Sequence, residues 1–115
     1  MTADDFRRLA LGFPETSEGA HMGHPDFRVN GRVFATLHGT GTGRGMVKLP
    51  PEQQHNFVRT HPGAFAPASG AWGRQGCTTV LLEAVDTDAV RNALEIAWRC
   101  AMAMPPPKTR LRKRK

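Results

Sequence analysis

Two histidines three residues apart, His21 and His24 in the segment HMGH, have a spacing that could bind zinc. His38 or a cysteine would have to supply a third ligand. The segment contains Gly23 and Pro25, which disfavour a helix, and no HExxH or CxxC pattern accompanies it. Because a metal site needs three or four converging ligands, we predict no metal and no cofactor here.

The glycine-rich segment HGTGTGRG, residues 38–45, was tested as a phosphate-binding loop. A GxGxxG motif would need glycine where Arg44 or Met46 stands, and no GxxxxGK[ST] motif is present. Both motifs lead into a helix, whereas this segment leads into the strand-like MVKL. We therefore predict a flexible hairpin loop with Arg44 at its tip, placed to touch a nucleic-acid backbone as a wing.

No set of nucleophile, base and orienting group can be assembled from the chain. Ser17 and Ser69 lie outside any GxSxG motif, and the sequence has no tyrosine. Several acids stand where helices are expected to begin, and capping accounts for them: Asp4, Asp5, Asp86 and Asp88. We expect that the protein is not an enzyme.

The segment GAWGRQG, residues 70–76, places Trp72 and Arg74 among three glycines. A tryptophan in such a loop either closes one end of the core or stands exposed as a stacking platform. We interpret Trp72 as the plug of the core, and Arg74 as exposed and available to a partner.

The elements that must position these residues begin with a helix that ends before Pro14. Thr2 and Asp5 fit a capping box. Apolar residues recur at helical spacing: Phe6, Leu9, Ala10 and Phe13.

Asn30-Gly31 predicts a two-residue hairpin turn between two strands. In strict alternation, one sheet face carries Phe27, Val29, Phe34 and Thr36, and the other carries Arg28, Val33, Ala35 and Leu37. We assign the face with both phenylalanines to the core. The other face is expected to be open to solvent or to a partner.

The remaining elements complete an α+β fold. MVKL is followed by a helix from Pro51 that Pro62 ends, then by a loop with one short strand, and then by the buried strand CTTVLLEAV. The last helix begins at residues 86–88 and places Trp98 on its apolar face. Short turns between strands require antiparallel pairing. We predict two layers: a mainly antiparallel sheet with three helices packed on one face.

Charge is concentrated at the C-terminus. The net charge is +6, but residues 108–115, KTRLRKRK, hold six of the sixteen Lys and Arg residues, so the other ten balance the ten acids. We predict one domain over residues 1–104 and a Pro-rich, then basic, disordered tail over 105–115. No apolar run is long enough for a membrane span and no signal peptide is evident, so we expect a cytoplasmic protein. In a reducing compartment, Cys77 and Cys100 are expected to be free, buried thiols.

Four segments resemble the MmcQ/YjbR family of small bacterial proteins, and in order they cover most of residues 3–104: RRLALGFPETSEGAHMGHPDFRVNGRVFATL, VKLPPEQQ, PGAFAPASGAWGRQGCTTVLL and ALEIAWRCAMAM. The chain departs from the family pattern at Cys77, where an aromatic residue is usual, and in its basic tail. The resemblance implies a two-layer fold similar to secretion chaperones. It also implies DNA binding, from the family's likeness to a double-wing domain. The family-type positions that would contact DNA are Arg28, Arg32, Lys48, Trp72 and Arg74.

We therefore expect a DNA-binding protein that contacts mainly phosphates through its basic middle segment and its tail. Added to the family-type positions, the expected contacts are Arg44 from the wing and the tail residues Arg110, Arg112, Lys113, Arg114 and Lys115. The alternatives are a protein-interaction or homodimerising module that uses the open sheet face, and a small-ligand binder with a pocket near Trp72. A membrane role is not expected, and we expect a monomer.

Overall fold

The computed structural model describes residues 1–21, 23–38 and 43–104. The glycine-rich residues 39–42 lie outside the described residues, and so do the expected tail contacts and the expected disorder of residues 105–115. Arg44, at the edge of the glycine-rich segment, is described.

The described part of the chain contains six strands and four helices. The helices are α1 (Ala3–Leu11), α2 (Pro51–Thr60), α3 (Gly70–Arg74) and α4 (Thr87–Ala103). The strands are β1 (Thr16–His21), β2 (His24–Val29), β3 (Arg32–His38), β4 (Arg44–Lys48), β5 (Phe65–Pro67) and β6 (Cys77–Leu81). Among the described residues, no helix is long and apolar enough to cross a membrane.

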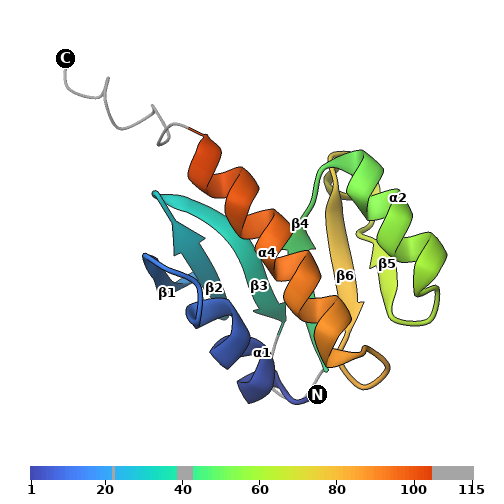
Figure 1. Cartoon of the computed structure of the whole chain (residues 1–115), viewed down its shortest axis with the longest axis horizontal. Coiled ribbons are helices and arrows are strands. Elements are labelled where there is room, and N and C mark those ends of the chain that lie inside the picture. Colours follow the sequence, from blue (N-terminus) through green and yellow to red (C-terminus); the bar gives the residue numbers. More distant parts are fainter. Residues whose placement is uncertain (22, 39–42, 105–115) are drawn as a thin grey trace.

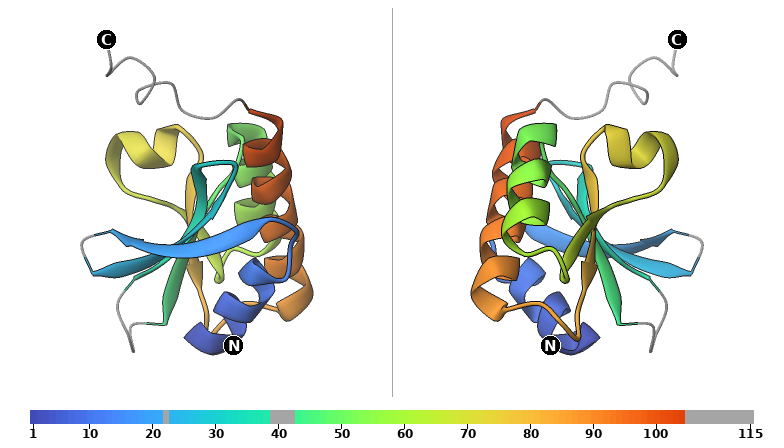
Figure 2. Two further views of the ribbon diagram at one scale, coloured as in Figure 1. Left: turned by 90° about the vertical axis from the view of Figure 1, so that its left-hand side faces the viewer. Right: turned by 90° about the vertical axis from the view of Figure 1, so that its right-hand side faces the viewer.

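The strands form one sheet in the order β1-β2-β3-β4-β6-β5, and each neighbouring pair is antiparallel. Helices α1, α2 and α4 cover one face of this sheet, as the two side views in Figure 2 show. The short helix α3, yellow in Figure 2, lies on the opposite face. The predicted α+β fold with three helices on one face is confirmed, and α3 is an addition, because residues 70–74 were expected to be loop.

Local signals set most helix boundaries. Thr2 and Asp5 form the predicted capping box at the start of α1, and Asp86 accepts a hydrogen bond from the Ala89 amide as the N-cap of α4. Pro51 occupies the first turn of α2, where its missing N–H costs nothing. Helix α4 runs diagonally across the sheet and ends beside the β2–β3 hairpin (Figure 1), where the side chain of Asn30 donates to the Met104 carbonyl at 2.7 Å.

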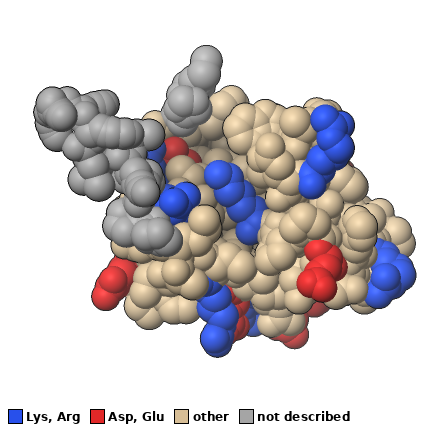
Figure 3. All heavy atoms as spheres, turned by 90° about the horizontal axis from the view of Figure 1, so that it is seen from above, with Lys and Arg blue, Asp and Glu red and all other residues tan. Residues whose placement is uncertain are grey.

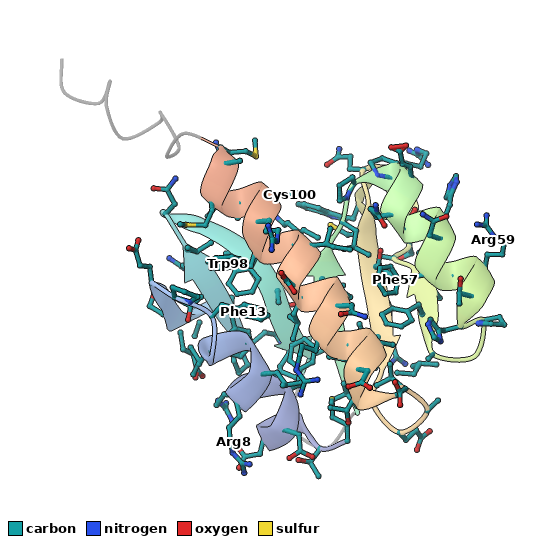
Figure 4. All side chains as sticks on the ribbon, viewed as in Figure 1. Arg8, Phe13, Phe57, Arg59, Trp98 and Cys100 are labelled. Carbon is teal, nitrogen blue, oxygen red and sulfur yellow. The ribbon has the colours of Figure 1, made fainter. Side chains whose placement is uncertain are left out.

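The core fills the space between the sheet and the three helices on its covered face. Its largest fully buried side chains include Phe6, Phe27, Phe34 and Phe65. Trp98 on α4 is half-buried and stacks on Phe13 with ring centroids 5.5 Å apart (Figure 4). Its indole N–H donates to the Pro14 carbonyl at 3.1 Å, so the predicted place of Trp98 on the apolar face of α4 is confirmed.

The predicted hairpin turn is present, but the faces assigned to β3 need correction. Asn30 and Gly31 both have positive φ, and Val29 lies opposite Arg32 as expected. Phe27, however, lies opposite Ala35, because Phe34 is an extra residue in a β-bulge. Beyond the bulge the alternation reverses, so Ala35 and Leu37 are buried in the core.

The strand predicted from CTTVLLEAV is shorter than expected. β6 ends at Leu81, and the chain then turns through residues 82–84 toward α4. Leu82 and Val85 are nevertheless buried, which explains why the whole segment is apolar. Both cysteines are free thiols as predicted. Cys77 is buried as expected, whereas Cys100 is only half-buried.

Candidate functional site

The uncovered face of the sheet carries a cavity of about 820 Å³. Strands β2, β3, β4 and β6 form its floor, and the α3 region forms one wall. It is lined by His24, Asp26, Arg28, Val33, Thr36, His38, Arg44, Met46, Lys48, Ala68, Ser69, Trp72, Cys77 and Thr79. Its size falls in the range of pockets that hold small molecules or single groups of a larger ligand, roughly 300–1,000 Å³.

An ion pair holds one cation of the cavity in a fixed orientation. Arg28 donates from Nε and Nη2 to the two carboxylate oxygens of Asp26, at 2.8 and 3.0 Å. Asp26 is 2% exposed, and the side chain of Arg28 is 43% exposed. The hydrogen bonds to Asp26 raise the pKa of Arg28, so this guanidinium stays charged. Gly19 on β1 makes room for the pair, because a Cβ there would lie 2.9 Å from Asp26 Oδ1.

Two further cations reach the cavity from β4. Arg44 is the first residue of this strand and lies opposite His38, so it is not at the tip of the hairpin loop as predicted. Arg44 and Lys48 alternate with the buried Val47 and with Gly45, which packs against Phe6, so both cations project from the open face. Among the described residues that line the cavity, Asp26 is the one acid. The cavity therefore carries an excess of positive charge even though the described chain as a whole is formally neutral.

The other predicted contact residues are not gathered there. Arg32 pairs with the buried Val29, which places it on the helix side of the sheet. Arg74 is exposed on α3 but does not line the cavity. Seen from above, Lys and Arg side chains are spaced apart by uncharged surface and interrupted by acids (Figure 3). This view is edge-on to the sheet, and on the side that it shows the positive charge does not form a continuous stripe.

Trp72 is not the core plug predicted from the sequence. It is 64% exposed and lines the cavity from α3. Gly73, the next residue, allows close packing of the backbone, because a Cβ there would lie 1.8 Å from the Ala68 carbonyl oxygen. The backbone of α3 therefore packs closely against the backbone at Ala68, and the indole of Trp72 is exposed to solvent.

Helix α3 is also held by α2. Gln54 on α2 is 4% exposed, and its side-chain amide donates to the carbonyls of Gly73 and Cys77, at 3.0 and 2.9 Å. Gly76, with φ +110°, allows the chain to pass Leu49, whose carbonyl oxygen would lie 1.7 Å from a Cβ at that position. These contacts fix the place of Trp72 relative to the sheet.

The interior of the cavity contains titratable and polar groups. Desolvation, and then His24 and Arg44, lower the pKa of His38, whose ring centroid is 5.3 Å from that of His24. Burial raises the pKa of the Cys77 thiol, with Lys48 acting in the opposite direction, so Cys77 is a poor nucleophile at neutral pH. The hydroxyl of Thr36 is buried and makes no hydrogen bond within the described part of the protein.

Sequence reasoning did not identify Asp26, Thr36 or Gln54 as parts of this site. Asp26 had a detectable signal, since it precedes Arg28 by two residues in a strand and side chains two apart share a face. Thr36 was assigned to the core because the bulge was not foreseen. Gln54 had no signal in the sequence, because its partners come from residues 19 and 23 positions further along the chain.

Two other candidate sites are less well supported. The described residues contain no cluster of three or more His, Cys, Asp or Glu that could hold a metal ion. A groove of about 510 Å³ between α2 and α4 is lined by residues that include Phe57, His61, Glu95 and Arg99. Its charges are already paired, since Arg99 donates to Glu95 at 2.6 Å.

The sequence model of the YjbR family matches residues 11–100. The chain belongs to the YjbR family. This YjbR-family protein is also similar in structure to Deinococcus radiodurans protein DR2400, which is known from a crystal structure and carries the domain DUF419. The TM-score is 0.76 at 22% identity, over 89% of this chain and 79% of that one, which supports the fold alone. No curated protein matches the chain.

Proposed function

We propose that this YjbR-family protein binds DNA through the open face of its sheet, with most contacts made to phosphates. The observation that carries the proposal is the convergence of Arg28, Arg44 and Lys48 on one uncovered face with a single lining acid. Phosphate contacts from such cations supply most of the affinity of sequence-independent DNA binding.

A protein-interaction role for the same face is less well supported. That alternative depended on Val33, Ala35 and Leu37 as apolar residues of the open face. Ala35 and Leu37 are buried in the core, and only Val33 lines the cavity on that face. Trp72 is the exposed large apolar side chain that lines the cavity, and three cations line the same cavity: Arg28, Arg44 and Lys48. A partner for this face should therefore be anionic rather than broadly apolar.

The test separates the folded domain from its tail. A chain that ends at Met104 is titrated with labelled duplex and single-stranded DNA at low salt, as the parent domain and as the double variant Arg44→Ala/Lys48→Ala. We expect the parent domain to bind one or both forms, and the double variant to bind at least tenfold more weakly with a salt slope shallower by about two charges.

The matched control removes two arginines from the helix side, Arg8→Ala/Arg59→Ala. Both side chains are exposed there (Figure 4), so this variant loses the same formal charge without touching the cavity. If the truncated domain binds neither DNA form, or if both double variants lose affinity equally, the open face is not the binding site.

A further inference from the structure

The cavity is chemically more specific than a phosphate-binding surface requires. Phosphate contacts need cations alone, yet this cavity joins its cations to an exposed indole and to a polar floor. Thr36, Met46 and Thr79 lie in one row across β3, β4 and β6, as shown by their pairing in the sheet. Three kinds of group therefore face one space: positive charge, an aromatic surface, and hydroxyls.

Trp72 has the properties of a stacking platform. It is 64% exposed, although a tryptophan side chain is largely buried in most folded proteins. Its helix is fixed by the Gln54 hydrogen bonds and by the close contact of Gly73 with Ala68, so the backbone that carries the indole is held in place relative to the sheet. Stacking of a nucleobase on such a side chain is independent of sequence.

Thr36 lines the same cavity, and its buried hydroxyl has no hydrogen-bond partner among the residues that the structure describes. A buried hydroxyl without a partner is destabilising, and native proteins rarely retain one. A ligand with a polar edge would satisfy it. The edge of a nucleobase carries such donors and acceptors, whereas an inorganic phosphate would have no use for the aromatic face of Trp72.

We propose that the cavity holds one unpaired nucleotide, with its base against Trp72, the polar edge of the base toward Thr36, and its phosphate near Arg44 and Lys48. This inference rests on the proposed function of the same face and narrows it. A paired base hides both its faces and its pairing edge, so the nucleotide must be free or unpaired within a strand.

The experiment uses the full chain and four probes: deoxyadenosine monophosphate, a single-stranded oligodeoxynucleotide, the same oligonucleotide with an abasic site at every third position, and the matching duplex. Affinities are measured by isothermal titration calorimetry at one salt concentration. We expect the single strand to bind at least tenfold more tightly than the duplex, and the abasic strand to bind more weakly than the intact one. Binding of the mononucleotide would identify free nucleotides as a second source of the ligand.

Three variants connect these affinities to the cavity. Trp72→Ala should weaken binding of the intact single strand roughly 10- to 100-fold, and Trp72→Phe should recover part of the loss because it retains an aromatic face. Thr36→Val keeps the shape of the side chain but removes the hydroxyl, so it should weaken binding while the protein stays folded. Trp98→Phe, on the helix side, is the control.

The outcomes distinguish this inference from the proposed function. If single strand and duplex bind equally and Trp72→Ala changes neither, the nucleotide cavity is refuted while binding of DNA to phosphates stands. If the mononucleotide binds in a Trp72-dependent way and neither DNA form binds, the cavity is upheld and the DNA proposal fails. Binding of no probe refutes both.

Discussion

The two tryptophans of this protein lie on opposite sides of the sheet and have opposite roles. Trp98 stacks on Phe13 and donates to the Pro14 carbonyl, so it ties α4 to the end of α1. Trp72 is exposed at the rim of the cavity. A side chain that contributes little to folding and yet remains large and apolar is expected to contribute to binding instead.

Alanine substitutions should separate the two roles. Trp98→Ala removes a stacked ring and a hydrogen bond, so we expect a loss of about 2–3 kcal/mol in the free energy of unfolding. Trp72→Ala should change that free energy by less than about 0.5 kcal/mol, since exposed positions contribute little. Urea denaturation followed by circular dichroism measures both. Comparable losses in the two variants would contradict the assignment of Trp72 to the ligand.

His38 predicts a dependence of stability on pH. Its pKa in the folded protein is lowered by desolvation, His24 and Arg44, so below pH 6.5 the unfolded chain takes up a proton more readily than the folded chain does. The contribution of neutral His38 to the free energy of unfolding is therefore complete above pH 6.5. It is lost as the pH falls through the lowered pKa of the folded protein. The other charged side chains that line this cavity are those of Arg28, Lys48 and Asp26.

We expect the free energy of unfolding to decline between pH 7 and pH 5, and to decline less steeply in His38→Asn. His55→Asn, an exposed position on α2, serves as the control. Thermal unfolding at a series of pH values measures the slopes. Equal slopes for wild type and His38→Asn would show that other groups cause the decline.

At the scale of elements, α3 positions the binding surface although it is only five residues long. At Gly73 the backbone of α3 packs directly against the backbone of Ala68. Gly73→Ala should displace α3 and cost about 3 kcal/mol of stability, because neither backbone segment has room to move easily. It should also reduce the DNA affinity of the variants that still fold, because Trp72 moves with the helix.

Gly63→Ala is the matched control, since nothing lies within 4 Å of a Cβ at that position and its φ is not positive. We expect it to leave both stability and affinity near their wild-type values. Differential scanning calorimetry and DNA titration measure the pair. If Gly73→Ala folds and binds as well as Gly63→Ala does, α3 does not position the indole.

The elements that could be predicted from the sequence were those set by neighbours along the chain. The capping box of Thr2 and Asp5, the Asn30-Gly31 turn and the apolar face of α4 all depend on residues within a few positions, and all are present. The cavity depends on contacts between distant strands. Its cations were found because charge is visible in a sequence, but their grouping was not.

The bulge in β3 had a signal that strict alternation overlooks. Phe34 and Leu37 are both strongly apolar and three positions apart, so a regular strand places them on opposite faces and cannot bury both in a core on one face. An extra residue between them resolves this conflict. The exposure of Trp72 had no comparable signal, because a glycine-rich segment is compatible with either a plug or a platform.

For the whole molecule, the position of charge decides how binding depends on salt. Residues 108–115 hold six cations without an acid, whereas the body is balanced. Removal of residues 105–115 should make the slope of log K against log salt shallower by up to about five for duplex DNA, because each phosphate contact contributes nearly one unit. Titrations of the full chain and of the chain ending at Met104 across a salt series measure this difference.

The difference between single strand and duplex should survive that truncation, since we assign it to the cavity and not to the tail. If the truncated chain binds both forms equally while the full chain does not, the tail rather than the cavity carries the discrimination.

The bulge at Phe34 makes the length of β3 matter more than the identity of many of its residues. Deletion of this one residue would restore strict alternation and exchange the sides on which Thr36 and Leu37 lie. A substitution at the open face alters one contact. A deletion at Phe34 would exchange the core side and the open side for every residue of β3 beyond the bulge. Descendants of this sequence should therefore accumulate substitutions around the cavity while they inherit the number of residues between the hairpin turn and His38 unchanged.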